Sequence, residues 1–142
     1  MINSTLNVSR YTGTPPALDA SDMARRIDGP IYEANDVLAL ASACKLEFWS
    51  RGASRDAQKW SLDIADVSGM LVSAIKGNCF RGAEWCLQKP GGPWAACDVY
   101  VVVQRKWNEA AHKDMDTAFY LKCAISKAGS MLLSASNHPT GS

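Results

Sequence analysis

The chain has 142 residues, a formal net charge of +1, and 47% hydrophobic against 20% charged residues. This length suits one domain that buries its own core, and the composition excludes a disordered chain. The small net charge excludes a uniformly basic nucleic-acid binder but leaves the local arrangement of charge open.

The apolar runs and the cysteines predict the compartment. The longest apolar runs, VLALASAC and VYVVV, fall short of the roughly 18 residues that a membrane helix needs. The start of the chain lacks the pattern of a secretory signal. The five cysteines are odd in number and form no C-x-x-C pair, which favours reduced thiols over disulfides or zinc. We expect a cytoplasmic protein without membrane contact, metal or cofactor.

The first 34 residues predict an arm that packs over the core. TGTPP and IDGP interrupt this part of the chain, and such Pro and Gly clusters end regular elements. Within the arm, DASDMARRI can form one or two helical turns, capped by Ser21 or Asp19. The main domain is predicted over residues 35–138, with a tail over residues 139–142.

Helices are predicted in the first half of this domain. A helix is expected over about residues 36–45, followed by the extended segment LEFWS and by a helix in RDAQKWSLD that Ser54 caps. Asp66 is expected to cap a third helix that ends at Gly77. The apolar stripe of this third helix comprises Val67, Met70, Leu71, Ala74 and Ile75.

After Gly77 the hydrophobic period shortens toward two residues. The segments CFRGAEWCLQK, CDVYVVVQRKW, AFYLKCAIS and SMLLSASNH are predicted to be antiparallel strands, with KPGGP as a turn. Helices followed by strands predict an α+β fold in which helices pack on one face of an antiparallel sheet. The other face is then open to solvent or a ligand.

Alternation along the strands predicts which side chains lie on that open face. We assign to it the cations Arg81 and Lys122, the rings of Tyr100 and Tyr120, and His138. Asp98 and Gln104 fall on the side of Tyr100, and Ser134 and Ser136 on the side of His138. Single-stranded RNA is bound by such rings and cations, and its metal-free cleavage needs a base, a cation and an acid. The alternative is an ordinary solvated sheet face.

Three segments resemble one known family. Trp94 to Tyr100 reads W-x-x-x-D-V-Y, Tyr120 to Lys122 reads Y-L-K, and a terminal strand runs over residues 134–138. Together with NCFRG upstream, these segments resemble the motility quorum-sensing regulator (MqsR) toxins, small ribonucleases of type II toxin–antitoxin systems. The resemblance covers about residues 36–138. It implies a RelE-like fold with a curved sheet, cleavage of messenger RNA on the exposed sheet surface, and a cognate antitoxin, with the protein either a monomer or in a complex with that antitoxin.

The resemblance implies roles for individual residues. Arg81 matches the basic catalytic residue, Tyr120 the catalytic tyrosine and Lys122 the lysine of the same strand. Because a guanidinium stays charged, Arg81 can hold a phosphate, which leaves Tyr120 or His138 to handle protons. The residues predicted to bind RNA are Tyr100, Trp85, Trp94 and Gln104; core packing is the alternative for the tryptophans. The alternative function is a non-catalytic module that binds protein or RNA.

Overall fold

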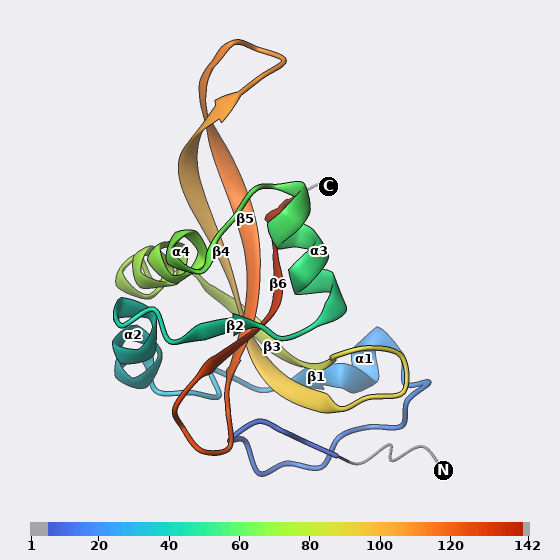
Figure 1. Cartoon of the computed structure of the whole chain (residues 1–142). Helices are drawn as coiled ribbons and strands as arrows, with labels where there is room; N and C mark the ends of the chain where they lie inside the picture. Colours follow the sequence, from blue (N-terminus) through green and yellow to red (C-terminus); the bar gives the residue numbers. More distant parts are fainter. Residues whose placement is uncertain (1–5, 141–142) are drawn as a thin grey trace.

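The structure is a computed structural model that describes residues 6–140 (Figure 1). Residues 1–5 of the predicted arm and residues 141–142 of the predicted tail lie outside the described residues. The described part of the chain contains four helices and six strands. In chain order they are α1 (Asp22–Arg25), β1 (Arg26–Ile27), α2 (Ala34–Ser42), β2 (Leu46–Phe48), α3 (Arg51–Lys59), α4 (Ile64–Lys76), β3 (Phe80–Leu87), β4 (Trp94–Asn108), β5 (Lys113–Ile125) and β6 (Leu132–Pro139).

All six strands belong to one sheet in the order β1-β3-β4-β5-β6-β2. The pairs are antiparallel except that β2 lies parallel to β6. The predicted α+β class is therefore confirmed, but the sheet is mostly rather than wholly antiparallel. The parallel pair arises because the LEFWS segment returns to the sheet as an edge strand before the antiparallel strands begin.

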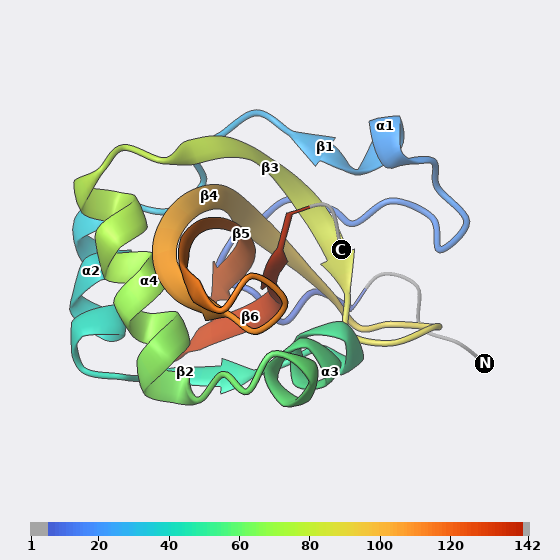
Figure 2. The same cartoon turned by 90° about the horizontal axis from the view of Figure 1, so that it is seen from above.

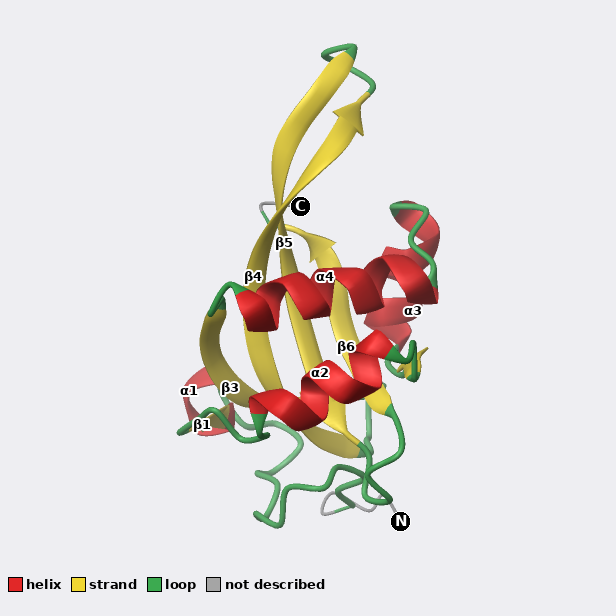
Figure 3. Cartoon of the chain, turned by 90° about the vertical axis from the view of Figure 1, so that its left-hand side faces the viewer, coloured by secondary structure: helices red, strands yellow, loops and turns green. Residues whose placement is uncertain are grey.

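Helices α2 and α4 lie side by side across one face of the sheet (Figure 3). The sheet curls, and both helices lie outside the curl (Figure 2). This covered face carries the main core, in which Met70 and Leu71 of α4 are buried in one cluster with Tyr100 and Leu121 of the sheet. None of the helices in residues 6–140 has the length and apolar character that crossing a bilayer requires.

Three helices begin earlier than their sequence predicts, and α2 (Ala34–Ser42) also ends before the expected residue 45. Ser50, not Ser54, caps α3, where its Oγ accepts the Ala53 N–H at 2.9 Å. Asp63, not Asp66, caps α4, and the two aspartates exchange hydrogen bonds in a capping box. In α3 and α4 the earlier polar residue satisfies the first free N–H groups, which lengthens the helix by a turn or less. Gly77 ends α4 as predicted.

The arm packs against the lower part of the covered face. The ring of Tyr11 meets Trp85 edge to face at a centroid distance of 5.6 Å, and Trp85 meets Trp94 at 6.5 Å. The Val8 N–H donates to the Trp94 carbonyl at 2.9 Å. Ser21 caps the short α1, as one of the two predicted residues. The arm thus extends the apolar cover where α2 and α4 do not reach.

Strands β4 and β5 continue beyond the helices as a projecting hairpin (Figures 1 and 3). The segment RKWNEAAHKDMDT is mostly paired strand, because the ladder continues to Asn108 opposite Lys113. Val103 and Trp107 on this hairpin are 59% and 56% exposed. The hairpin thus exposes two apolar side chains to solvent, in a part of the sheet that the helices do not cover.

Candidate functional site on the open face of the sheet

The strand register defines which side chains share the uncovered face of the sheet. Residues paired across neighbouring strands point to the same face. Val99 pairs with Lys122, and Tyr120 pairs with both Val101 and His138. Glu84 pairs with Arg26 on one side and Cys97 on the other. The open face therefore includes Arg26, Glu84, Cys97, Val99, Val101, Tyr120, Lys122, His138 and Ser136, which pairs with Lys122.

An ion pair lies at the centre of this face. Lys122 Nζ donates to Glu84 Oε2 at 3.1 Å, and the two side chains are only 20% and 30% exposed. Burial by itself lowers the pKa of Lys122, but its interactions with Cys86 and with the Glu84 carboxylate outweigh this, so that the pKa lies above its usual value. Lys122 is therefore an ammonium at neutral pH, which can stabilise an anion but cannot accept a proton.

Tyr120 connects Lys122 to His138. The Lys122 Nζ lies 5.3 Å from the centre of the Tyr120 ring, and the rings of Tyr120 and His138 are stacked with centroids 5.8 Å apart and planes 21° apart. His138 Nδ1 is 3.0 Å from the Pro139 carbonyl oxygen. Because a carbonyl oxygen only accepts, Nδ1 carries the proton in this contact. Nε2 is thereby the nitrogen that can give or take a proton.

Arg81 reaches the same face through a β-bulge. Phe80 pairs with Tyr100 and Gly82 with Val99, so that Arg81 is the extra residue of β3. Arg81 is exposed, and no carboxylate of residues 6–140 lies within ion-pair distance of it. It lines a pocket of about 420 Å³ whose other polar walls are Arg26, Asp28, Glu84 and Tyr120. This pocket, with Lys122 and His138 at its side, is the candidate site.

All four predicted catalytic residues thus lie close together, but the predicted RNA-binding residues do not. Tyr100 is buried on the covered face, where its ring meets Phe80 at 6.2 Å. The prediction that it lies on the open face is wrong, because Val99 and Val101 occupy that face instead. The alternation itself is correct, but the more polar side of this strand, with Asp98 and Tyr100, is the covered one, so polarity indicates the wrong side.

The predicted positions of four further residues are also corrected. Trp85 and Trp94 are buried together under the arm, so core packing accounts for both. Gln104 lies on the hairpin, and its register with Thr117 continues the covered face. Ser134 is buried on the covered face and donates to Asn137, because an irregularity in the pairing of β5 with β6 separates it from Ser136. None of these side chains reaches the candidate site.

Asp98 was also expected on the open face and is instead fully buried on the covered face. Its two carboxylate oxygens accept the N–H groups of Ile31 and Tyr32 at 2.9 and 3.1 Å. Burial raises the pKa of Asp98, and these two hydrogen bonds lower it by less. Asp98 therefore fastens the end of the arm to β4 and has no contact with the candidate site.

Sequence reasoning missed three polar residues of the site, Arg26, Asp28 and Glu84. Glu84 has the wrong parity relative to Arg81 for an unbroken strand, and only the bulge at Arg81 places both on one face. Arg26 lies in the arm, which gave no sign of pairing with the sheet, yet it lies opposite Glu84 in β1. A glycine directly after the basic residue, in FRGAE, is the one signal that could have indicated the bulge.

Cys97 of the open face is not a nucleophile. Cys97 is fully buried, and its hydrogen bond with Cys86, together with burial, raises the pKa of its thiol well above the usual value. A thiol held in its protonated form is a poor nucleophile. Within residues 6–140 there is no group of three His, Cys, Asp or Glu side chains placed to hold a metal ion.

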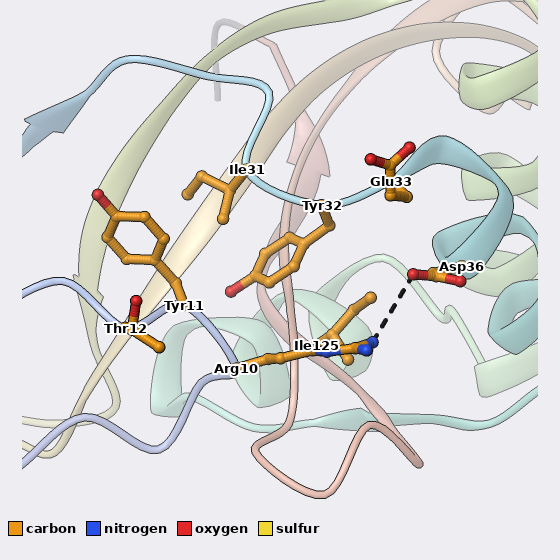
Figure 4. Close-up of a pocket in the computed structure, with 8 residues that line it drawn as sticks. All are labelled: Arg10, Tyr11, Thr12, Ile31, Tyr32, Glu33, Asp36 and Ile125. Carbon is orange, nitrogen blue, oxygen red and sulfur yellow. Dashed lines mark ion pairs between the residues drawn. The ribbon is translucent and has the colours of Figure 1, made fainter.

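A second pocket lies between the arm and α2 (Figure 4). It has a volume of about 310 Å³, and the Arg10–Asp36 ion pair, with a separation of 3.7 Å, spans its rim. The hydroxyl of Tyr32, which lines the pocket, already donates to the Ala96 carbonyl at 2.6 Å. Its cation is thus held by a carboxylate and its hydroxyl by a carbonyl, whereas Arg81 of the open face forms no ion pair among residues 6–140.

The fold and site define a class of protein: an α+β domain with a cationic pocket and a carboxylate on the open face of a curled sheet. Comparison with known proteins adds no family, because no family model, curated protein or solved structure matches the chain. What this domain does is therefore argued from the geometry of the pocket.

Proposed function

We propose that the protein is a metal-independent endoribonuclease that cleaves single-stranded RNA on the open face of its sheet. The observation that carries this proposal is the Glu84 carboxylate, held at 3.1 Å by the Lys122 ammonium in a pocket that Arg81 and Tyr120 also line. This arrangement supplies a proton acceptor beside cations. Glu84 is thus the proposed general base, a role for which the sequence offered only Tyr120 or His138.

The groups of the pocket match the steps of cleavage by the 2′-hydroxyl. Glu84 Oε1, which has no partner among residues 6–140, takes the proton of the 2′-hydroxyl. The 2′-oxygen then bonds to phosphorus, and the bond from phosphorus to the 5′-oxygen breaks. His138 Nε2, in the imidazolium form, gives its proton to that 5′-oxygen. The products are a 2′,3′-cyclic phosphate and a 5′-hydroxyl.

The remaining residues stabilise and position. Arg81 and Lys122 place two positive charges where the phosphate gains negative charge in the transition state. Tyr120 stacks on His138 and so fixes the plane of the imidazole, which makes Tyr120 a positioning residue rather than a proton carrier.

The proposed biological role follows the resemblance of the strand motifs. In that role the protein is a cytoplasmic toxin of a type II toxin–antitoxin system, it cleaves messenger RNA, and a cognate antitoxin inhibits it. The motifs at residues 94–100 and 120–122 support this role, as does the accessible pocket that an inhibitor could cover.

Cleavage of a labelled single-stranded RNA in EDTA tests the proposal. The wild type is expected to produce 2′,3′-cyclic ends and to leave DNA intact, because DNA lacks the attacking hydroxyl. Glu84→Gln keeps the hydrogen bond to Lys122 but cannot accept a proton, so we expect a loss of roughly 10²- to 10⁴-fold in kcat. Glu47→Gln, which removes one exposed carboxylate from β2, is the matched control. A folded wild type that leaves RNA intact would refute the proposal.

One observation favours the second candidate, a non-catalytic RNA-binding module. Lys122 neutralises Glu84 in the free protein, and this leaves Arg26 and Arg81 to bind phosphates without a reaction. The same assay separates the candidates, because a binding module retains RNA without cleaving it, and Glu84→Gln, which frees the charge of Lys122, then does not lower the affinity.

A further inference from the structure

A second basic pocket lies away from the open face, between the start of α3 and the turn that joins β3 to β4. It has a volume of about 430 Å³. The cations Arg51 and Arg55 of α3 and Lys89 of the turn line it, together with Trp49, Ser50, Ser54 and Gln88. No acidic residue lines this pocket, in contrast to the pocket of the candidate site.

Backbone hydrogen bonds hold the two walls of this pocket together. The Arg51 N–H donates to the Gln88 carbonyl at 3.0 Å, and Gln88 Nε2 donates to the Trp49 carbonyl at 3.0 Å. The Ala53 N–H is also engaged, since Ser50 Oγ accepts it. Two of the first N–H groups of α3, those of Arg51 and Ala53, thus already have acceptors. An anion in the pocket must therefore be bound by the side chains.

The charge of the pocket is not neutralised by the protein. Arg51 and Arg55 are four residues apart and share the exposed side of α3. The nearest acid of the helix, Asp56, is turned to β6, where it accepts the Asn137 N–H at 3.1 Å. In the part of the chain that the structure describes, Arg51, Arg55 and Lys89 form no ion pair. Like charges held close together repel one another, and an anion would relieve this repulsion.

The basic row continues along α3. Lys59 is four residues beyond Arg55, and its Nζ lies 5.0 Å from the centre of the Trp60 ring, which is 37% exposed. Helix α3 runs beside the end of β6, to which Asp56 and Asn137 connect it. His138 of the candidate site is the next residue of β6. A strand bound along α3 would therefore extend toward the open face.

We propose that Arg51, Arg55 and Lys89 form a phosphate site that binds the backbone of a single-stranded nucleic acid, outside the site of cleavage. Cations that are spaced along a groove beside an exposed aromatic ring are the means by which single strands are bound without sequence preference. The site does not depend on the endoribonuclease activity, because a strand binds here whether or not the open face cleaves it.

Fluorescence anisotropy with a labelled 12-nucleotide single-stranded DNA tests the site, since DNA is not a substrate of the proposed reaction. Arg51→Ala/Arg55→Ala is expected to raise the Kd about tenfold at low salt and to reduce the slope of log K against log salt by about 1.4, the value for two lost phosphate contacts. Lys45→Ala/Lys76→Ala removes the same charge from exposed positions elsewhere and should change the Kd less than twofold. Equal effects of the two double variants would overturn the proposal.

Two further arms identify the ligand and separate the two proposals. In the first, inorganic phosphate and the unlabelled strand, at the same total phosphate concentration, compete with the labelled strand for the protein. The unlabelled strand is expected to compete far better. Equal competition would assign the pocket to small anions and overturn the proposal. Cleavage of a dinucleotide, too short to reach α3, should be unchanged in Arg51→Ala/Arg55→Ala. Failure of cleavage with intact strand binding would refute only the endoribonuclease.

Discussion

The two faces of β4 differ in polarity, and the face with the more polar side chains is the buried one. On one face, Trp94, Asp98 and Tyr100 are buried under the arm and α4. On the other, Val101 and Val103 become progressively exposed toward the projecting hairpin. The aromatic and acidic side chains, which are usually the signs of a functional surface, belong here to the core. The valines form the floor beside the reactive groups that β3, β5 and β6 supply.

The largest expected effect comes from comparing two tryptophans of this one strand. Trp94 is fully buried, whereas Trp107 is 56% exposed on the hairpin. Trp94→Ala leaves a cavity and should lower the free energy of unfolding by about 4 kcal/mol. Trp107→Ala should change it by less than about 0.5 kcal/mol. Urea denaturation followed by circular dichroism measures both. Similar losses for the two variants would mean that the hairpin is packed and not free.

Asp98 provides a smaller and more specific test of the covered face. Asp98→Ala leaves the N–H groups of Ile31 and Tyr32 without an acceptor in a buried position, which should cost about 2–3 kcal/mol. Asp116→Ala is the control, because Asp116 is 70% exposed and its ion pair with Arg105 is worth less than about 1 kcal/mol. An Asp98→Ala protein as stable as the control would contradict a fastening role.

Much of the fold was predictable because it depends on local patterns. The stripe of α4 and the alternation in β5 correctly identified the buried side of each element. The pairing of β1 with β3 and of β2 with β6 was not predictable. These strands have two and three residues, too few to show a period, and their positions depend on contacts with distant parts of the chain.

The candidate site was predictable where side chains on one strand carry it. Tyr120 and Lys122 share a face by their spacing alone, and His138 joins them through the register of β6. Glu84 and Arg26 could not be found, because their places depend on a bulge and on an arm strand. The prediction for Tyr100 is wrong for a third reason. Alternation shows which residues of a strand share a face, but the elements that pack on the sheet decide which face is buried.

The smallest expected effect is a dependence of stability on pH that Asp98 alone produces. Burial raises the pKa of Asp98 in the folded protein above its ordinary value of 3.8. Between these two pKa values the folded protein binds more protons than the unfolded chain, so the free energy of unfolding falls as pH rises through that interval. Asp98→Asn cannot titrate and lacks this fall.

The stability of the wild type relative to Asp98→Asn should therefore decrease from pH 3 upward and become constant above the folded pKa. A difference that is constant over the whole range, or that grows with pH, would mean that the hydrogen bonds from Ile31 and Tyr32 outweigh burial. The two hydrogen bonds would then stabilise Asp98 as a carboxylate although its side chain is buried.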